Sequence, residues 1–311
     1  FNNLTGNGTA TGADGNDSLS GIENVTGSAY NDSLTGSSAA NVLTGGDGND
    51  FLQARGGDDS VYGGSGNDYL GGGTGNDLLD GGAGYDRASF SNGSTGPVTV
   101  DLRIQGVAQS TGLGTDTLIG IENLTGTAFG DTLIGDDGDN WLWGATDSAG
   151  VGDTIDGQGG NDLIEVGVGN HVLSGGTGTD TFSFNPFSVP TNATISLALQ
   201  GAAQDTGAGS MTLSGFENLS GSIFTDTLIG DGNNNILAGS EGDDTLEGGA
   251  GNDTLHGDGY FGTNTSPSGQ ITLYADVAAL GGASANDTLE GGIGDDLLDG
   301  AGGVDTARYA N

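Results

Sequence analysis

The sequence predicts an all-β solenoid in which very short parallel strands stack along the chain. A nine-residue pattern, Gly-Gly-x-Gly-x-Asp-x-(Leu/Ile/Val)-x, recurs over most of the 311 residues. Its apolar residue returns once in nine, whereas an amphipathic helix needs three or four in two turns. Its glycines permit positive φ, so each repeat is expected to be a turn followed by a short strand.

The clearest run of repeats begins at Gly27 and continues without a gap to Ser89. An apolar residue in the eighth place of each repeat can fill the inside of a tight coil, whereas the sixth place is acidic. The sixth place of the seven repeats holds Asp32, Asn41, Asp50, Asp59, Asp68, Asp77 and Asp86, and the eighth holds Leu34, Leu43, Leu52, Val61, Leu70, Leu79 and Ala88.

A longer period is superimposed on the short one. Three six-residue interruptions, which we call hexads, occupy Gly21–Thr26, Gly120–Thr125 and Gly215–Ser220. Each hexad contains a Glu-Asn pair, follows one repeat and precedes a run of repeats. The sequence therefore predicts three blocks: residues 1–89, 111–183 and 206–311, with joining segments at 90–110 and 184–205 and an insert at 257–281 in the third block.

The segments between the repeats have a different pattern. Val98–Leu102 and Thr194–Leu199 alternate between apolar and polar residues, which predicts short strands that cap or join the blocks. The insert contains Tyr260, Phe261 and Ile271–Tyr274, and we expect a loop with its own strand pair.

Complete copies of the pattern begin at Gly63, Gly72, Gly248 and Gly291. In these copies the chain resembles the repeats-in-toxin (RTX) family, whose haemolysin-type nonapeptides form a calcium-binding parallel β-roll. The resemblance implies that sixth-place aspartates and glycine-turn carbonyls hold several Ca²⁺ ions between neighbouring coils.

We count 23 repeats, of which 18 keep the sixth-place aspartate. By the resemblance, the calcium ligands are Asp17, Asp32, Asp50, Asp59, Asp68, Asp77, Asp86, Asp116, Asp131, Asp153, Asp162, Asp180, Asp226, Asp244, Asp253, Asp287, Asp296 and Asp305. An alternative is that these aspartates only satisfy local backbone groups, as in Asx turns.

Five repeats have another residue in the sixth place: Asn41, Asn140, His171, Met211 and Asn235. Asparagine offers a neutral oxygen, which predicts weak sites, and the His171 and Met211 repeats are expected to hold no ion. The three asparagines all stand in the second repeat after a hexad, and this regularity suggests a designed gap.

Composition independently favours a cationic ligand. With 42 acidic residues, four arginines and no lysine, the net charge is −38, so the compact chain repels itself. Calcium suits such a chain because it accepts six to eight oxygen ligands from carboxylates and carbonyls. The absence of cysteine removes disulfides as the alternative cross-link.

The same charge excludes nucleic acid as a partner and disfavours an anionic membrane surface. No apolar run reaches the length needed for membrane insertion. His171 and His256 fall at regular repeat places, so the sequence predicts no enzyme.

Other residues leave alternatives open. The hexad residues Glu23, Glu122 and Glu217 are extra metal ligands or, as we favour, hydrogen-bonding residues at a kink in the coil. Trp141 and Trp143 flank Leu142, should point outward, and form a candidate contact surface, for example for a polysaccharide.

The sequence therefore predicts a calcium-binding, secreted bacterial protein fragment with a structural role in a surface layer, filament or large adhesin. It would leave the cell unfolded by one-step (type I) secretion and fold in extracellular calcium. Possible partners are further copies of the chain or a cell-surface component. The alternative is an export and folding module of a secreted hydrolase or toxin. Both ends interrupt the pattern, so we expect a piece of a longer protein.

Overall fold

A computed structural model describes residues 7–12, 15–20, 22–145, 151–184, 191–263, 271–274 and 285–309. The described chain is almost entirely β-strand, and its regular elements other than strands are two 3₁₀ helices. Neither of these helices has the length or the apolar character needed to cross a membrane. The chain divides into an N-terminal unit, which contains residues 1–136, and a C-terminal unit, which contains residues 137–263 and 271–311.

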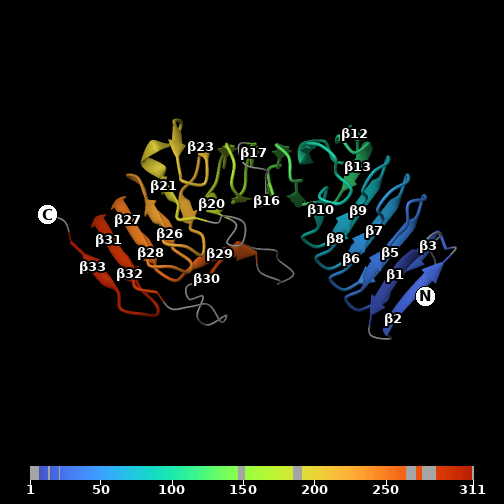
Figure 1. The fold of residues 1–311 in the computed structure, drawn as a ribbon, viewed down its shortest axis with the longest axis horizontal. Helices are drawn as coiled ribbons and strands as arrows, with labels where there is room; N and C mark the ends of the chain where they lie inside the picture. The colour runs from blue at the N-terminus through green and yellow to red at the C-terminus, as the bar shows by residue number, and fades with distance from the viewer. Residues whose placement is uncertain are drawn as a thin grey trace. The chain divides into compact units, whose positions relative to one another are not determined.

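Two stacks of short strands build the N-terminal unit (Figure 1). The first stack consists, in spatial order, of β2 (Gly15–Ser20), β1 (Asn7–Gly12), β4 (Ser33–Thr35), β6 (Phe51–Gln53), β8 (Tyr69–Gly71), β10 (Arg87–Ser89) and β14 (Asn123–Thr125). The second consists of β3 (Asn24–Thr26), β5 (Val42–Asp47), β7 (Ser60–Ser65), β9 (Leu78–Ala83), β13 (Thr115–Ile119) and β12 (Gln109–Ser110). A further parallel pair joins β11 (Thr99–Asp101) to β15 (Thr132–Ile134), and the 3₁₀ helix η1 spans Leu102–Ile104.

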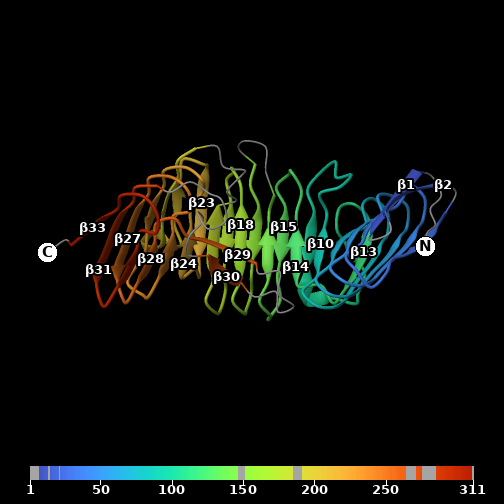
Figure 2. The ribbon, with the colours of Figure 1, turned by 90° about the horizontal axis from the view of Figure 1, so that it is seen from below.

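The C-terminal unit repeats this plan, and Figure 2 shows its successive strands side by side. One stack consists of β16 (Trp141–Trp143), β18 (Leu163–Val166), β20 (Thr181–Phe184), β24 (Asn218–Ser220), β26 (Ile236–Ala238), β28 (Thr254–His256) and β32 (Leu297–Asp299). Opposite it lie β17 (Thr154–Asp156), β19 (Val172–Ser174), β23 (Ser210–Ser214) and β22 (Ala203–Asp205). They are followed by β21 (Thr194–Ser196), η2 (Leu197–Leu199), β25 (Thr227–Ile229), β27 (Thr245–Ala250), β31 (Thr288–Ile293) and β33 (Thr306–Arg308).

The register confirms the parallel β-roll. Leu43 on β5 lies beside Val61 on β7, and Val61 lies beside Leu79 on β9, so one coil contains two repeats and 18 residues. These eighth-place side chains are buried and form the narrow core between the two stacks. Because one side chain per repeat fills this core, hydrophobic burial is small for a chain of this length.

The first repeat differs from the expected coil. Strand β2, which contains Asp17, pairs antiparallel with β1, and β1 pairs antiparallel with β4. A hairpin therefore stands where the pattern predicted a parallel coil, because no earlier coil among the described residues offers β2 a parallel neighbour.

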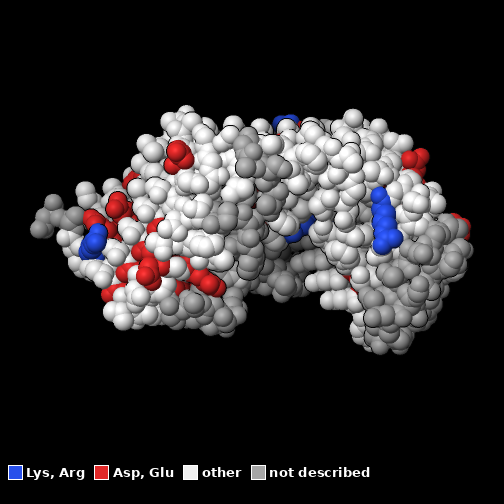
Figure 3. Space-filling model, viewed as in Figure 1, with Lys and Arg blue, Asp and Glu red and all other residues white. Residues whose placement is uncertain are grey.

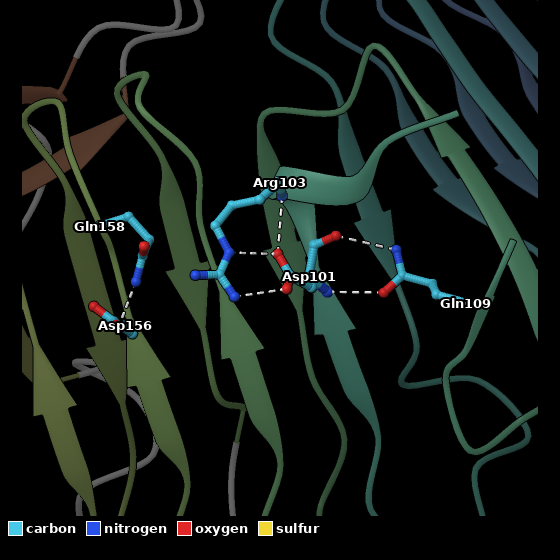
Figure 4. A network of polar contacts seen from close by, with 5 residues as sticks. All are labelled: Asp101, Arg103, Gln109, Asp156 and Gln158. Atoms are coloured by element: carbon cyan, nitrogen blue, oxygen red, sulfur yellow. Dashed lines mark hydrogen bonds and ion pairs between the residues drawn. The ribbon is translucent and has the colours of Figure 1, made fainter. Parts of the chain in front are cut away.

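The joining segments enter the stacks as irregular coils. Val98, Val100 and Leu102 are buried, and β11 pairs in parallel with β15. The Gln109 side chain forms hydrogen bonds with both backbone groups of Asp101: its Nε2 donates to the Asp101 carbonyl, and its Oε1 accepts from the Asp101 N–H (Figure 4). In the second joining segment, the Gln204 side chain forms the same two hydrogen bonds with the backbone of Ser196, and we call this pair of bonds a bracket.

The insert in the third block contains the expected strand pair. Strands β29 (Tyr260–Thr263) and β30 (Ile271–Tyr274) form an antiparallel hairpin. Phe261 packs against Leu163 and Ala238, with Trp141 and Ile236 beside them. Trp141, expected to point outward, is half-buried, packs against this cluster, and donates from Nε1 to Glu165 Oε2 at 2.9 Å.

Candidate metal centre

Aspartates of neighbouring coils are linked through one carboxylate oxygen. In the first stack of the N-terminal unit, the backbone N–H of Asp32 donates to Asp50 Oδ1 at 2.7 Å. Asp50 donates in the same way to Asp68 at 2.7 Å, and Asp68 donates to Asp86 at 2.8 Å. This arrangement is a ladder that runs along one edge of the coils, because each rung joins residues 18 apart.

Further ladders follow the other edges. Asp59 donates to Asp77, and Asp77 donates to Asp116, each at 2.9 Å. In the C-terminal unit the bonded pairs are Asp162 with Asp180, Asp226 with Asp244, Asp244 with Asp287, Asp253 with Asp296 and Asp287 with Asp305. The regular nine-residue spacing therefore brings most of the predicted ligands into continuous rows.

The second carboxylate oxygen remains buried without a hydrogen bond in many of these repeats. Among the described residues, Oδ2 is in this state in Asp50, Asp59, Asp68, Asp86, Asp180, Asp244, Asp253 and Asp287. A buried, unpaired carboxylate oxygen is costly, because neither water nor the protein replaces its lost hydration.

Backbone carbonyls converge on the same place. A Cβ built at Gly63 would lie 2.5 Å from the Gly81 carbonyl oxygen and would also collide with Asp68 Oδ2. At Gly248 the corresponding neighbours are the Gly291 carbonyl, at 2.6 Å, and Asp253 Oδ2. The missing side chain of the first-place glycine thus leaves a cradle bordered by a carboxylate and a carbonyl from the coil ahead.

Burial makes these carboxyl groups hard to ionise in the ion-free chain. Desolvation raises the pKa of Asp50, Asp59 and Asp68 to about 6, and neighbouring aspartates add to the effect for Asp50 and Asp59. Burial of Asp244, together with the charges of Asp226, Asp287 and Asp258, raises the pKa of Asp244 to about 10. A bound cation would lower these pKa values, since an opposite charge favours the carboxylate.

The surface agrees with this internal placement of the acids. Although the chain has 42 acidic residues, most of the face shown in Figure 3 is neither acidic nor basic. Many carboxylates lie instead along the buried edges of the coils.

The donor set fits calcium. Within the described part of the chain, no three His, Cys, Asp or Glu side chains converge, so an ion would need backbone oxygens as well as carboxylates. Hard oxygen donors in a flexible mixture of this kind are the ligands that Ca²⁺ prefers. The residues placed to hold it are the aspartates with an unpaired Oδ2 and the first-place glycine carbonyls beside them.

The remaining predicted ligands have other surroundings. In Asp32, Asp116, Asp131 and Asp226, serine or threonine hydroxyls of the same repeat bond the carboxylate. Asp77, Asp153 and Asp162 are buried, whereas Asp296 is half-buried and Asp305 is exposed in the last coil. The side chain of Asp17 lies outside the described residues.

The sixth-place exceptions preserve the ladder in part. His171 Nδ1 accepts the Asp153 N–H at 2.9 Å, so a neutral imidazole there carries its proton on Nε2. Met211 is fully buried and has no polar atom that could bind an ion strongly.

Two ladder residues fall outside the nonapeptide pattern. Glu122 Oε2 accepts the Asp86 N–H at 2.7 Å, and Glu217 Oε2 accepts the Asp180 N–H at 2.8 Å. These two hexad glutamates thus occupy the rung that an aspartate would hold, as the hydrogen-bonding interpretation predicts, whereas Glu23 is exposed. Glu122 and Glu217 stand at corresponding places in successive blocks, and so do Gln109 and Gln204. This recurrence from block to block is the sequence signal that could identify such hydrogen-bonding residues.

Comparison with known families agrees with this geometry. The model of the RTX calcium-binding nonapeptide repeat matches residues 20–52, 35–70, 53–88, 116–148, 150–182, 213–245, 229–259 and 281–307. These ranges together cover more than half of the chain. No curated protein matches the sequence.

Proposed function

Since the chain belongs to the family of RTX calcium-binding nonapeptide repeat proteins, we propose that it is an extracellular structural module that folds when calcium fills its coil edges. The observation that carries this proposal is the row of buried, unpaired carboxylate oxygens, most of them beside a glycine carbonyl. Calcium at these places supplies the charge that the buried carboxylates need.

Calcium availability determines where such a chain folds. At millimolar calcium, a site with a dissociation constant of about 10⁻⁴ M contributes about 1.4 kcal/mol to the folded state. Many sites in one stack add to a large stabilisation, whereas a low-calcium cytoplasm leaves the net charge of −38 uncompensated. We therefore propose type I secretion in an unfolded state and folding outside the cell.

A scaffold role is supported by the repetition of whole blocks. Glu122 and Glu217 make the same ladder bond, and Gln109 and Gln204 make the same bracket. Such periodic construction suits a surface layer, filament or large adhesin, in which identical segments follow one another. We propose further copies of the chain or a cell-surface component as partners.

We propose no catalytic role for the chain itself. The two histidines lie within the repeat framework: His171 joins a ladder, and His256 lies on β28 with its Nδ1 3.5 Å from Asp299 Oδ2.

The molar mass of the calcium-loaded chain tests the scaffold role. We would measure it by size-exclusion chromatography with light scattering over a range of concentrations. A mass that grows with concentration and returns to about 30 kDa with chelator supports self-association. A constant monomer mass would instead favour the export and folding module of a secreted hydrolase or toxin.

A further inference from the structure

Two classes of repeat differ at their second place. In one class the second-place residue has a positive φ, as in Gly46 (121°), Arg55 (85°) and Ser240 (80°). In the other class the second-place residue keeps an ordinary φ, and its N–H points back to the sixth-place side chain. Its members lie in the two repeats that follow a hexad: Ser28, Ser37, Thr127, Ser222 and Asp231.

In the first repeat after each hexad, the second-place residue forms hydrogen bonds with the carboxylate of the sixth-place aspartate. The Ser222 N–H and hydroxyl both donate to Asp226 Oδ2, at 2.5 and 2.8 Å. Ser28 bonds Asp32 Oδ2 in the same two ways, at 2.5 and 2.9 Å. In the second block, the Thr127 N–H donates to Asp131 Oδ2 and the Thr127 hydroxyl donates to Oδ1. The oxygen that is unpaired elsewhere is therefore already satisfied.

The second repeat after the first and third hexads uses an uncharged side chain. Asn235 Oδ1 accepts the Asp231 N–H at 2.8 Å, and Asn235 Nδ2 donates to the Glu217 carbonyl at 2.8 Å. Asn41 makes the corresponding contacts with the Ser37 N–H and the Glu23 carbonyl. The asparagine amide thus donates directly to a carbonyl of the preceding coil. An aspartate carboxylate in the same place would need a cation between itself and that carbonyl.

Ser240 shows that a second-place serine alone does not produce this closure. Its N–H donates to the Gly259 carbonyl at 2.8 Å, and Asp244 Oδ2 in the same repeat has no hydrogen bond. The same residue type therefore stands in both classes, and the backbone direction at the second place separates them.

We propose that the coil that follows each hexad is held without calcium, and that Ser28, Thr127 and Ser222 exclude the ion by bonding the aspartate that would bind it. The inference rests on the proposed calcium function and deepens it. Each block then begins with a coil that needs no ion, and the calcium-dependent coils stack on it. Asn140 stands at the matching place in the second block.

Ion counting on matched variants tests this assignment. Calcium per folded chain is measured by equilibrium dialysis and elemental analysis in the full chain, for wild type, Asp226→Asn and Asp244→Asn. Circular dichroism in saturating calcium checks that each variant is folded. We expect Asp226→Asn to bind as many ions as wild type and Asp244→Asn to bind at least one fewer. An equal loss in both variants would overturn the inference.

A second pair tests the part assigned to the second-place residue. Ser222→Gly frees Asp226 from its hydroxyl and permits positive φ, so we expect at least one additional ion per chain. Ser240→Gly is the control and should leave the count unchanged, because its repeat already belongs to the other class. An unchanged count in Ser222→Gly contradicts the role of the hydroxyl. A wild-type chain that binds no calcium would instead refute the proposed function itself.

Discussion

At the residue scale, a single carboxylate performs two tasks in this fold. In Asp68, Oδ1 accepts the Asp50 N–H and so joins two coils, whereas Oδ2 is left for an ion. The hexad residues Glu122 and Glu217 perform the first of these tasks. This division allows the ladder to continue through a hexad whose spacing differs from nine.

Removal of one hexad glutamate should weaken the ladder. In Glu217→Ala the buried Asp180 N–H loses its acceptor, which should lower the free energy of unfolding by about 1–3 kcal/mol. Urea unfolding in saturating calcium measures the change. Glu23→Ala is the matched control, because Glu23 is exposed, and it should change stability by less than about 0.5 kcal/mol. Equal effects in both variants would contradict the ladder role.

The raised aspartate pKa values predict that acid partly replaces calcium. Burial raises the pKa of Asp50 and Asp68 to about 6 and that of Asp77 and Asp86 to about 7 in the ion-free fold, above the usual 3.8. The folded state thus binds more protons than the unfolded state. The stability that these protonated aspartates contribute is fully present below about pH 3.8 and is lost as the pH rises through 6 to 7.

Circular dichroism in chelator measures this effect. We expect the ion-free chain to gain β signal as the pH falls from 8 to 4. In excess calcium the β signal should instead be present at pH 8 already. A β signal in chelator that falls with acidification would contradict the burial of these carboxyl groups.

At the element scale, the turn of each repeat depends on the missing side chain at its first place. In Gly63→Ala the new methyl group would meet the Gly81 carbonyl oxygen and Asp68 Oδ2. The overpacking should cost at least about 2 kcal/mol and weaken calcium binding. Gly232→Ala is the control, because its Cβ meets nothing within 4 Å, and we expect a change below about 1 kcal/mol. Thermal unfolding with and without calcium distinguishes the two variants.

The sequence was sufficient to predict the parallel coils, because stacked parallel coils bury the apolar eighth-place residues of all the repeats in one row. Leu43, Val61 and Leu79 lie beside one another as the period requires. The ladder of sixth-place side chains follows from the same register. The unpaired Oδ2 atoms then agree with the ion-binding interpretation of these aspartates.

Other features were not predictable from the period. Ser28 and Ser222 stand where the pattern has its second glycine, and only the structure shows that they bond the aspartate of their own repeat. For Asp32 and Asp226 the local, Asx-turn-like alternative therefore describes the contacts seen. Strand β2 fits the repeat pattern, but its direction depends on a neighbour and not on its own residues.

At the scale of the whole molecule, charge opposes folding, and the proposed role of calcium is to relieve it. The net charge of −38 and the 67 glycines both favour the unfolded chain in the absence of ions. We expect calcium to induce β signal in circular dichroism and to reduce the hydrodynamic radius cooperatively. Magnesium at the same concentration should do neither, since it requires octahedral geometry and releases water reluctantly. Identical spectra in calcium, magnesium and chelator would contradict the metal assignment.

The interrupted repeat of the third block has a practical consequence. Gly257 and Asp258 begin the turn and Ala285 to Asp287 complete it, yet Asp287 still bonds the Asp244 N–H and Thr288 still continues the stack. The entropy of closing a loop grows only slowly with its length, so such a turn tolerates a long excursion. A foreign peptide or small domain grafted between the second and fourth places of another repeat should be displayed without loss of the host fold, which makes the chain a candidate presentation scaffold assembled by adding calcium.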